Sequence, residues 1–280
     1  MQCIRVKRKI YSGSVLETEI YPINIDRVRD LKSREPSPRF KDPEDRRRHR
    51  DSIALQRMTR LINTNYDHNS LYSTLTFDNE HECHTFEEAK TCRNRFLRRV
   101  KYKYPDAVML IVMGRGKSTN RIHLHMLSSG VPEYMIWILW SYGEIADCRK
   151  LRRHNYYPDG SGGMVDHGED YTGLARYLFG HWTEEQKTVC KHRYMMTRNA
   201  AKPEKEDAKP IRRNYTPEKP PRTPKGYKLV EIHYTQYGYI KFKYVVDTGL
   251  GSPRAMNGRL YQAGEDPELL SSQLPERFRK

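Results

Sequence analysis

The sequence feature that most constrains the fold is a short alternating segment, Arg121-Ile122-His123-Leu124-His125-Met126-Leu127. Side chains of a strand alternate between its two faces, so His123 and His125 should leave the same face while the apolar residues around them leave the other. Two imidazoles side by side on a rigid strand suit chelation of a divalent metal. The alternative interpretation is a half-buried strand with two polar positions on its more exposed face.

The overall charge indicates the class of partner. The chain carries 51 Lys and Arg against 35 Asp and Glu, which gives a formal net charge of +16, and it contains 20 tyrosines. Such a balance, with a pI near 9.6, is typical of proteins that bind a polyanion by neutralising its phosphates. Ribosomal proteins, DNA enzymes and basic membrane-surface proteins all share this property.

Cysteine usage and hydropathy indicate the compartment. The cysteines are scattered and odd in number, which predicts a reducing cytoplasm rather than a disulfide framework. No apolar run is long enough to cross a bilayer, and no signal peptide is recognisable. We therefore expect a cytoplasmic protein without a membrane partner.

The chain divides into regions of different composition. Two β-rich runs, 3–11 and 15–23, surround a Ser-Gly-Ser turn and predict a hairpin. The Arg-rich, Pro-broken stretch 27–50 predicts a mobile basic arm, which fits a solvated charge run as well as a DNA contact. The predicted regions are 1–50 (hairpin and basic arm), 51–200 (central domain), 201–226 (basic, Pro-rich linker), 227–248 (second β-hairpin) and 249–280 (flexible tail).

Within the central domain, segments with the two-residue alternation of strands are interspersed with segments whose apolar residues recur at helical spacing. Thr85 and Glu88 have the spacing of a capping box. The order of the predicted strands and helices indicates an α+β fold with helices packed on one face of an antiparallel sheet. The predicted elements are helix 51–63, strand 71–78, helix 85–104, strands 107–113 and 121–127, a helix from Val131-Pro132, strand 144–151, a loop over 157–168 and helix 170–181.

The helix predicted over 170–181 carries two tyrosines that must point in different directions. At about 100° per residue, Tyr171 lies in the middle of an apolar stripe, which predicts a buried anchor. Tyr177 lies on the flank of that stripe, in line with His181, and is expected to remain more accessible. A tyrosine hydroxyl beside a bound metal can attack a phosphate and form a covalent enzyme–DNA intermediate.

Three segments resemble, in order, the motifs of the HUH endonucleases, in particular the rolling-circle replication initiator proteins of bacterial plasmids, phages and integrative elements. Thr74-Leu75-Thr76-Phe77 resembles the first motif strand, residues 121–125 resemble the His-hydrophobic-His motif, and Leu174-Ala175-Arg176-Tyr177-Leu178 resembles the third motif. The resemblance covers roughly residues 51–246 and implies an RRM-like nicking domain.

The resemblance also implies an activity. Tyr177 would nick and rejoin a single-stranded or hairpin DNA origin through a phosphotyrosine, with His123 and His125 binding Mn²⁺ or Mg²⁺. A separate helicase would unwind the DNA, since the sequence has no Walker motif. A relaxase or single-strand transposase would use the same chemistry, and a non-catalytic nucleic-acid-binding relative would keep only the fold.

Two positions depart from the family pattern. The lysine that usually follows the tyrosine by three residues is Gly180 here, and His181 is the candidate to replace it in positioning metal or phosphate. The glutamate on the strand before the histidines corresponds to Met113, a poor ligand for Mg²⁺ or Mn²⁺. We expect an oxygen ligand from elsewhere, with Asp78 as the first candidate and Glu80 and Glu144 as alternatives.

Basic residues near the motifs are the candidates for DNA binding: Arg115, Lys117, Arg121 and Arg176. Residues 114–117 resemble a phosphate loop but precede a strand rather than a helix, so we expect contacts to the DNA backbone rather than a nucleotide site. The remaining histidines and cysteines allow a zinc site as an alternative, although they lack a Cys-x-x-Cys pair. Its ligands would come from His81, Cys83, His84, Cys190 and His192.

Overall fold

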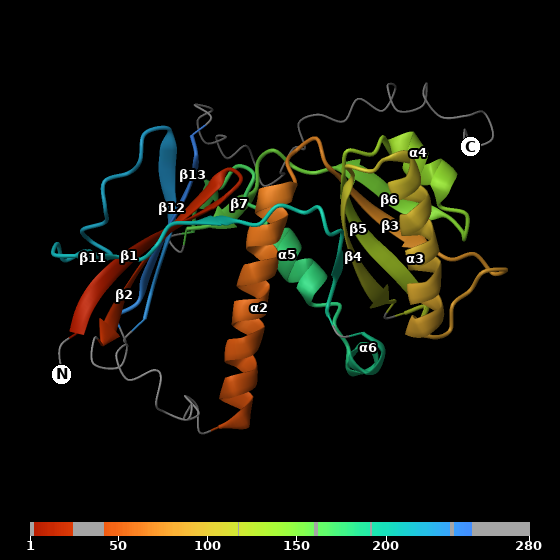
Figure 1. Cartoon of the computed structure of the whole chain (residues 1–280), viewed down its shortest axis with the longest axis horizontal. Helices are drawn as coiled ribbons and strands as arrows, with labels where there is room; N and C mark the ends of the chain where they lie inside the picture. Colours follow the sequence, from red (N-terminus) through yellow and green to blue (C-terminus); the bar gives the residue numbers. More distant parts are fainter. Residues whose placement is uncertain are drawn as a thin grey trace.

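The computed structural model describes residues 3–24, 42–116, 118–159, 162–190, 192–235 and 238–247. These residues form an α+β fold with two main antiparallel sheets, which confirms the predicted fold class (Figure 1). The predicted tail and most of the predicted basic arm lie outside the described residues. None of the helices in the described ranges has the length and apolar character that crossing a membrane requires.

The first sheet holds the histidine strand at its centre. Its strand order is β6-β3-β5-β4-β9, and every neighbouring pair is antiparallel. The prediction that the three strands near 71–77, 107–113 and 121–127 share one sheet is therefore confirmed. The strands are β6 (Ile145–Lys150), β3 (Leu71–Thr76), β5 (Ile122–Ser129), β4 (Val108–Arg115) and β9 (Met195–Met196).

Helices cover both faces of this sheet, so the expectation of one covered face was wrong (Figure 1). Leu124 packs in a core with α3 and α4, whereas Leu127 packs on the opposite side with α2 and α5. His123 and His125 share the face of Leu127, because strand side chains alternate. The helices are α2 (Pro43–Asn65), α3 (Phe86–Lys103), α4 (Glu133–Leu139) and α5 (Thr172–Phe179).

Capping residues determine where the helices begin. Thr85 and Glu88 form the predicted capping box at the start of α3. Helix α2 begins earlier than predicted, because Asp42 accepts a hydrogen bond from the Glu44 N–H and Pro43 occupies the first turn. The arginines of 46–50 are consequently helical and do not belong to a mobile arm, which corrects the predicted helix start at residue 51.

The two predicted hairpins are present and join into a second sheet with the order β10-β1-β2-β13-β12. Strand β13 pairs with β2, and both β10 and β11 pair with β1, so part of the predicted linker is bound to the sheet. The strands are β1 (Cys3–Ser12), β2 (Val15–Asn24), β10 (Glu204–Lys205), β11 (Lys209–Ile211), β12 (Tyr227–Tyr234) and β13 (Ile240–Val246).

A short hairpin and a further helix are among the elements that were not predicted. The loop expected over 157–168 contains a short hairpin of β7 (Tyr156–Pro158) and β8 (Met164–Asp166). Helix α6 (Glu184–Val189) follows α5, and its Gln186 side chain donates a hydrogen bond of 2.5 Å to the carbonyl of Met113. This contact holds α6 at the end of β4 next to the histidine strand.

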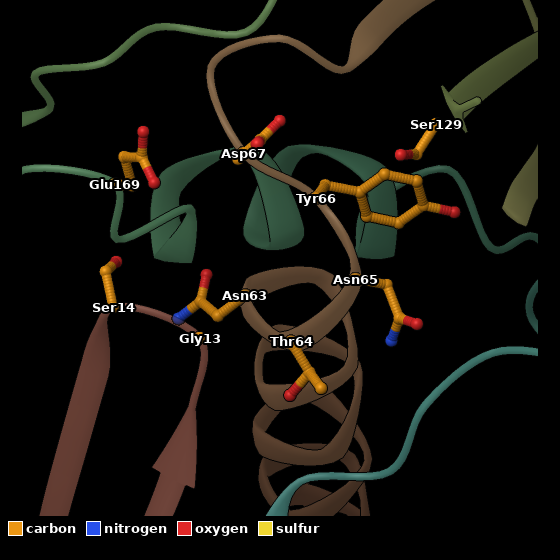
Figure 2. Close-up of a pocket in the computed structure, with 9 residues that line it drawn as sticks. All are labelled: Gly13, Ser14, Asn63, Thr64, Asn65, Tyr66, Asp67, Ser129 and Glu169. Carbon is orange, nitrogen blue, oxygen red and sulfur yellow. The ribbon is translucent and has the colours of Figure 1, made fainter. Parts of the chain in front are cut away.

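The second sheet packs on α2 through buried charges and a close turn. Arg60 of α2 donates hydrogen bonds to Glu17 at 2.5 Å and to Glu19 at 2.6 Å. The β1–β2 turn meets the end of α2, where a Cβ added at Gly13 would lie 2.0 Å from the carbonyl oxygen of Asn63 (Figure 2). Gly13 also has φ +57°, so both space and backbone conformation require glycine there. A polar cavity of about 190 Å³ remains beside this turn.

Helix α5, which carries Tyr177, is anchored to both α2 and the second sheet. The carboxylate of Asp170, just before the helix, is buried and pairs with Lys243 of β13 at 3.0 Å. The side-chain oxygen of Asn63 on α2 accepts a hydrogen bond of 2.9 Å from the backbone N–H of Tyr171. These contacts fix the start of α5 and hence the direction in which Tyr177 projects.

Candidate metal centre

Three histidines from two elements meet above the first sheet. His123 and His125 lie on β5, and His181 follows the end of α5. One ring nitrogen from each lies within 4.8 Å of those of the other two, so the group can hold a metal ion. Within the described part of the chain, no other set of three His, Cys, Asp or Glu side chains is arranged in this way.

The distances inside the group match those of metal ligands. The Nε2 atoms of His123 and His125 lie 3.0 Å apart. Two metal–nitrogen bonds of about 2.1 Å that meet at about 90° span this separation. The ring centroid of His181 lies 4.3 Å from that of His125 and 6.0 Å from that of His123. The third imidazole therefore faces the pair from the helix side.

A glycine on the neighbouring strand makes room for this group. Gly114 of β4 is paired with His123 across the sheet, so any side chain it had would point towards the histidines. A Cβ added there would lie 2.8 Å from Nε2 of His123 and 3.0 Å from Nδ1 of His181. Met113 instead points into the opposite core, so Gly114, not Met113, is the β4 position that faces the site.

The environment keeps two of the imidazoles in the neutral form that binds metals. Burial lowers the pKa of His125 to about 3, and the nearby His181 and His123 add to this effect. Burial also lowers the pKa of His123. Both rings are therefore uncharged near neutral pH and can offer a nitrogen lone pair without first losing a proton.

Tyr171, the N-cap of α5, and Tyr177 within the helix differ in exposure as predicted. Tyr171 is only 2% exposed and packs in the core between the sheet and α2. Tyr177 is 50% exposed, and its ring lies 5.3 Å from His125 and 4.8 Å from His181, measured between centroids. A half-exposed tyrosine thus lies beside two of the three imidazoles.

The carboxylate expected as the third ligand lies elsewhere. Strand β3 ends at Thr76, so its alternation does not extend to Asp78. The Asp78 carboxylate instead accepts a hydrogen bond of 2.8 Å from the backbone N–H of His81 and lies 2.8 Å from that residue's Nδ1. Glu80 and Glu144 are not part of the group either, and His181 occupies the third position.

The candidate DNA-binding residues differ in availability. The guanidinium of Arg115 pairs with Glu185 at 2.7 Å, and that of Arg121 pairs with Glu82 at 3.2 Å. Arg176 is exposed on α5 next to Tyr177. Lys117 lies outside the described residues. Of the three described residues, Arg176 is thus the best placed to meet a phosphate at Tyr177.

Sequence reasoning missed two residues that shape the site, Gly114 and Tyr72. Tyr72 lies on β3 with its hydroxyl 2.7 Å from Nδ1 of His125. The alternation of β3 could have revealed Tyr72. Tyr72 and Thr74 leave the same face of the strand, and Thr74 pairs with His125 across the sheet. The zinc site considered for the remaining histidines and cysteines does not assemble among the described residues.

Comparison with protein-family models, with curated proteins and with solved structures finds no match to this chain.

Proposed function

We propose that this chain is a metal-dependent endonuclease and strand transferase that nicks and rejoins single-stranded DNA, acting as a rolling-circle replication initiator. The observation that carries the proposal is the position of Tyr177, half exposed and packed against His125 and His181. The resemblance of the three sequence motifs and the strongly basic composition support DNA as the substrate.

The proposed reaction is a transesterification. The hydroxyl oxygen of Tyr177 forms a bond to phosphorus, the bond from phosphorus to the 3′ oxygen breaks, and the tyrosine proton is balanced by the proton gained at the released 3′-hydroxyl. One ester replaces another, so the reverse step rejoins the strand without an external energy source. A helicase encoded elsewhere would supply single-stranded DNA in the cytoplasm.

The histidine group is the proposed metal site. His123, His125 and His181 would hold a divalent ion, which polarises the scissile phosphate when bound. An all-imidazole set suits transition metals such as Zn²⁺, Fe²⁺ or Ni²⁺, whereas the two expected ions, Mg²⁺ and Mn²⁺, are usually held by oxygen ligands. Gly114 leaves the space that this arrangement needs, and this agrees with a site built for an ion rather than a packed core.

The test uses labelled single-stranded DNA with a randomised segment beside a hairpin, incubated with the full chain and Mn²⁺. We expect a covalent protein–DNA band that survives denaturation, and sequencing of the trapped DNA should reveal the preferred site. Tyr177→Phe should bind the DNA but form no adduct, since only the hydroxyl is lost. Tyr171→Phe is the matched control and should form the adduct.

Four outcomes would change the proposal. An adduct mapped to Tyr171 would refute the choice of nucleophile. No adduct on any tyrosine, with Mn²⁺, Mg²⁺, Co²⁺ and Zn²⁺ each supplied, would favour a non-catalytic nucleic-acid-binding protein. Unchanged cleavage by the His123→Ala, His125→Ala double variant would refute the metal site. A transposon end or a conjugative transfer site in the trapped DNA would indicate a transposase or a relaxase.

A further inference from the structure

The hydroxyl of Tyr72 lies where the metal group and the candidate nucleophile meet. Tyr72 is 5% exposed, and its hydroxyl is 2.7 Å from Nδ1 of His125. Its ring lies nearly parallel to that imidazole, with an angle of 21° between the planes. Thr74, two residues further along β3, donates a hydrogen bond of 3.2 Å to the same hydroxyl. This hydroxyl is thus held from two sides.

The two nitrogens of His125 have different surroundings, and this determines which one can bind a metal. Nε2 faces the Nε2 of His123, whereas Nδ1 faces Tyr72. A neutral imidazole that binds a metal through Nε2 carries its proton on Nδ1, and this N–H needs an acceptor. Among the described residues, the Tyr72 hydroxyl is the close partner of Nδ1 at 2.7 Å, whereas the Thr74 hydroxyl lies 3.5 Å away.

The hydrogen-bonding capacity of Tyr72 then points to a second contact. A tyrosine hydroxyl accepts two hydrogen bonds and donates one. Both acceptor positions are used when His125 and Thr74 donate to it, so its own proton remains available. Tyr177, whose ring centroid lies 5.3 Å from that of His125, is the neighbour that can receive this proton. The pKa of Tyr72 is raised by burial and also by a hydrogen bond with Tyr177.

We propose that Tyr72 is a positioning residue: its hydroxyl fixes His125 with Nε2 directed to the metal and holds the Tyr177 hydroxyl beside it. This inference rests on the proposed metal-dependent function. The competing interpretation is that Tyr72 only fills the core between the sheet and α2. Phenylalanine would preserve such a packing role, so a Tyr→Phe substitution separates the two.

The experiment measures Co²⁺ binding to the full chain by calorimetry and by the visible absorption of the ion. We expect Tyr72→Phe to weaken Co²⁺ binding by about 10- to 100-fold, the usual effect of removing the partner of a metal-bound histidine. The matched control is Tyr171→Phe, because the Tyr171 hydroxyl is buried with no hydrogen-bond partner among the described residues. It should bind Co²⁺ as the wild type does.

Two further readouts complete the test. Without metal, Tyr72→Phe should still unfold cooperatively, with a modest loss of thermal stability because His125 and Thr74 lose a buried hydrogen-bond partner. At saturating Mn²⁺, the single-turnover rate of adduct formation should fall in Tyr72→Phe while DNA affinity stays unchanged. Wild-type Co²⁺ affinity and spectrum in Tyr72→Phe would overturn the role of Tyr72 alone. Failure of the wild type to bind Co²⁺ would overturn both this inference and the metal site on which it rests.

Discussion

Gly114→Ala should damage the metal centre without removing any functional group. The added Cβ would lie 2.8 Å from Nε2 of His123 and 3.0 Å from Nδ1 of His181, whereas ordinary contact begins at 3.4 Å. The two rings would therefore have to move by about 0.6 Å and about 0.4 Å. Ligand positions in metal sites tolerate errors of only about 0.2 Å, so both shifts exceed what the site can absorb.

The expected effect on function is large and that on stability is small. Misplacing a reacting group by about 1 Å can reduce a rate by about 10²-fold, so we expect a loss of adduct formation between about tenfold and 10²-fold. Gly114 lies in a strand without a positive φ, so alanine fits its backbone. Alanine also lowers the conformational entropy of the unfolded chain, and this offsets part of the energetic cost of the clash. The free energy of unfolding should therefore change by less than about 1 kcal/mol.

The assay compares Co²⁺ affinity, adduct formation with Mn²⁺ and thermal unfolding in three proteins: the wild type, Gly114→Ala and Gly180→Ala. Gly180 lies between Tyr177 and His181, but a Cβ there would meet its nearest atom, the Tyr177 carbonyl oxygen, at an ordinary 3.4 Å. The control should therefore behave as the wild type does. If a folded Gly114→Ala binds Co²⁺ and forms the adduct normally, the metal does not lie where the three imidazoles meet.

Other predictions concern the third ligand and the buried charges. His181→Ala should abolish Co²⁺ binding and adduct formation while leaving DNA affinity intact; normal Co²⁺ binding would mean that His123 and His125 suffice. Lys243→Met should lower the free energy of unfolding in urea by about 3–5 kcal/mol, because it leaves the Asp170 carboxylate buried, charged and without its lysine. A decrease below about 1 kcal/mol would contradict the ion pair. Burial alone would raise the pKa of Asp170, but the His167 hydrogen bond and the charge of Lys243 hold it well below its usual value. The stabilisation by this low pKa is present above about pH 4, the ordinary pKa of aspartate, and is lost as the pH falls towards the folded value, so Asp170→Asn should show a weaker acid dependence of unfolding.

Features that depend on nearby residues could be predicted from the sequence. The capping box of α3, the two terminal hairpins and the burial of Tyr171 all follow from patterns within a few residues. The start of α2 was also locally encoded, because Asp42-Pro43 followed by Glu44 and Asp45 is an N-terminal helix signal. The dense arginine run directly after it has the composition of a solvated arm, so the charge pattern and the capping signal indicate different structures for the same segment.

Features that depend on distant pairing could not be predicted in this way. Strand β13 finds its partner β2 more than two hundred residues earlier in the chain, and nothing in either hairpin alone specifies that pairing. Covering helices on both faces of the first sheet also depend on tertiary packing. Leu127 and Val112 are apolar on the face that carries the histidines, so a rule that assigns one polar face to each strand gives the wrong number of layers.

In the candidate metal centre, the residue at position 114 on β4 and the histidine that follows α5 depend on each other. A side chain on β4 opposite His123 would occupy the space that the His181 imidazole fills, and Gly114 removes that side chain. The two departures from the HUH motifs that the sequence resembles are thus linked in space: β4 offers no carboxylate here, and a histidine beyond α5 completes the group that could hold a metal ion. Gly114 and His181 are 67 positions apart in the sequence. They meet because Asn63 and Asp170 anchor the start of α5 and so direct His181 towards β4.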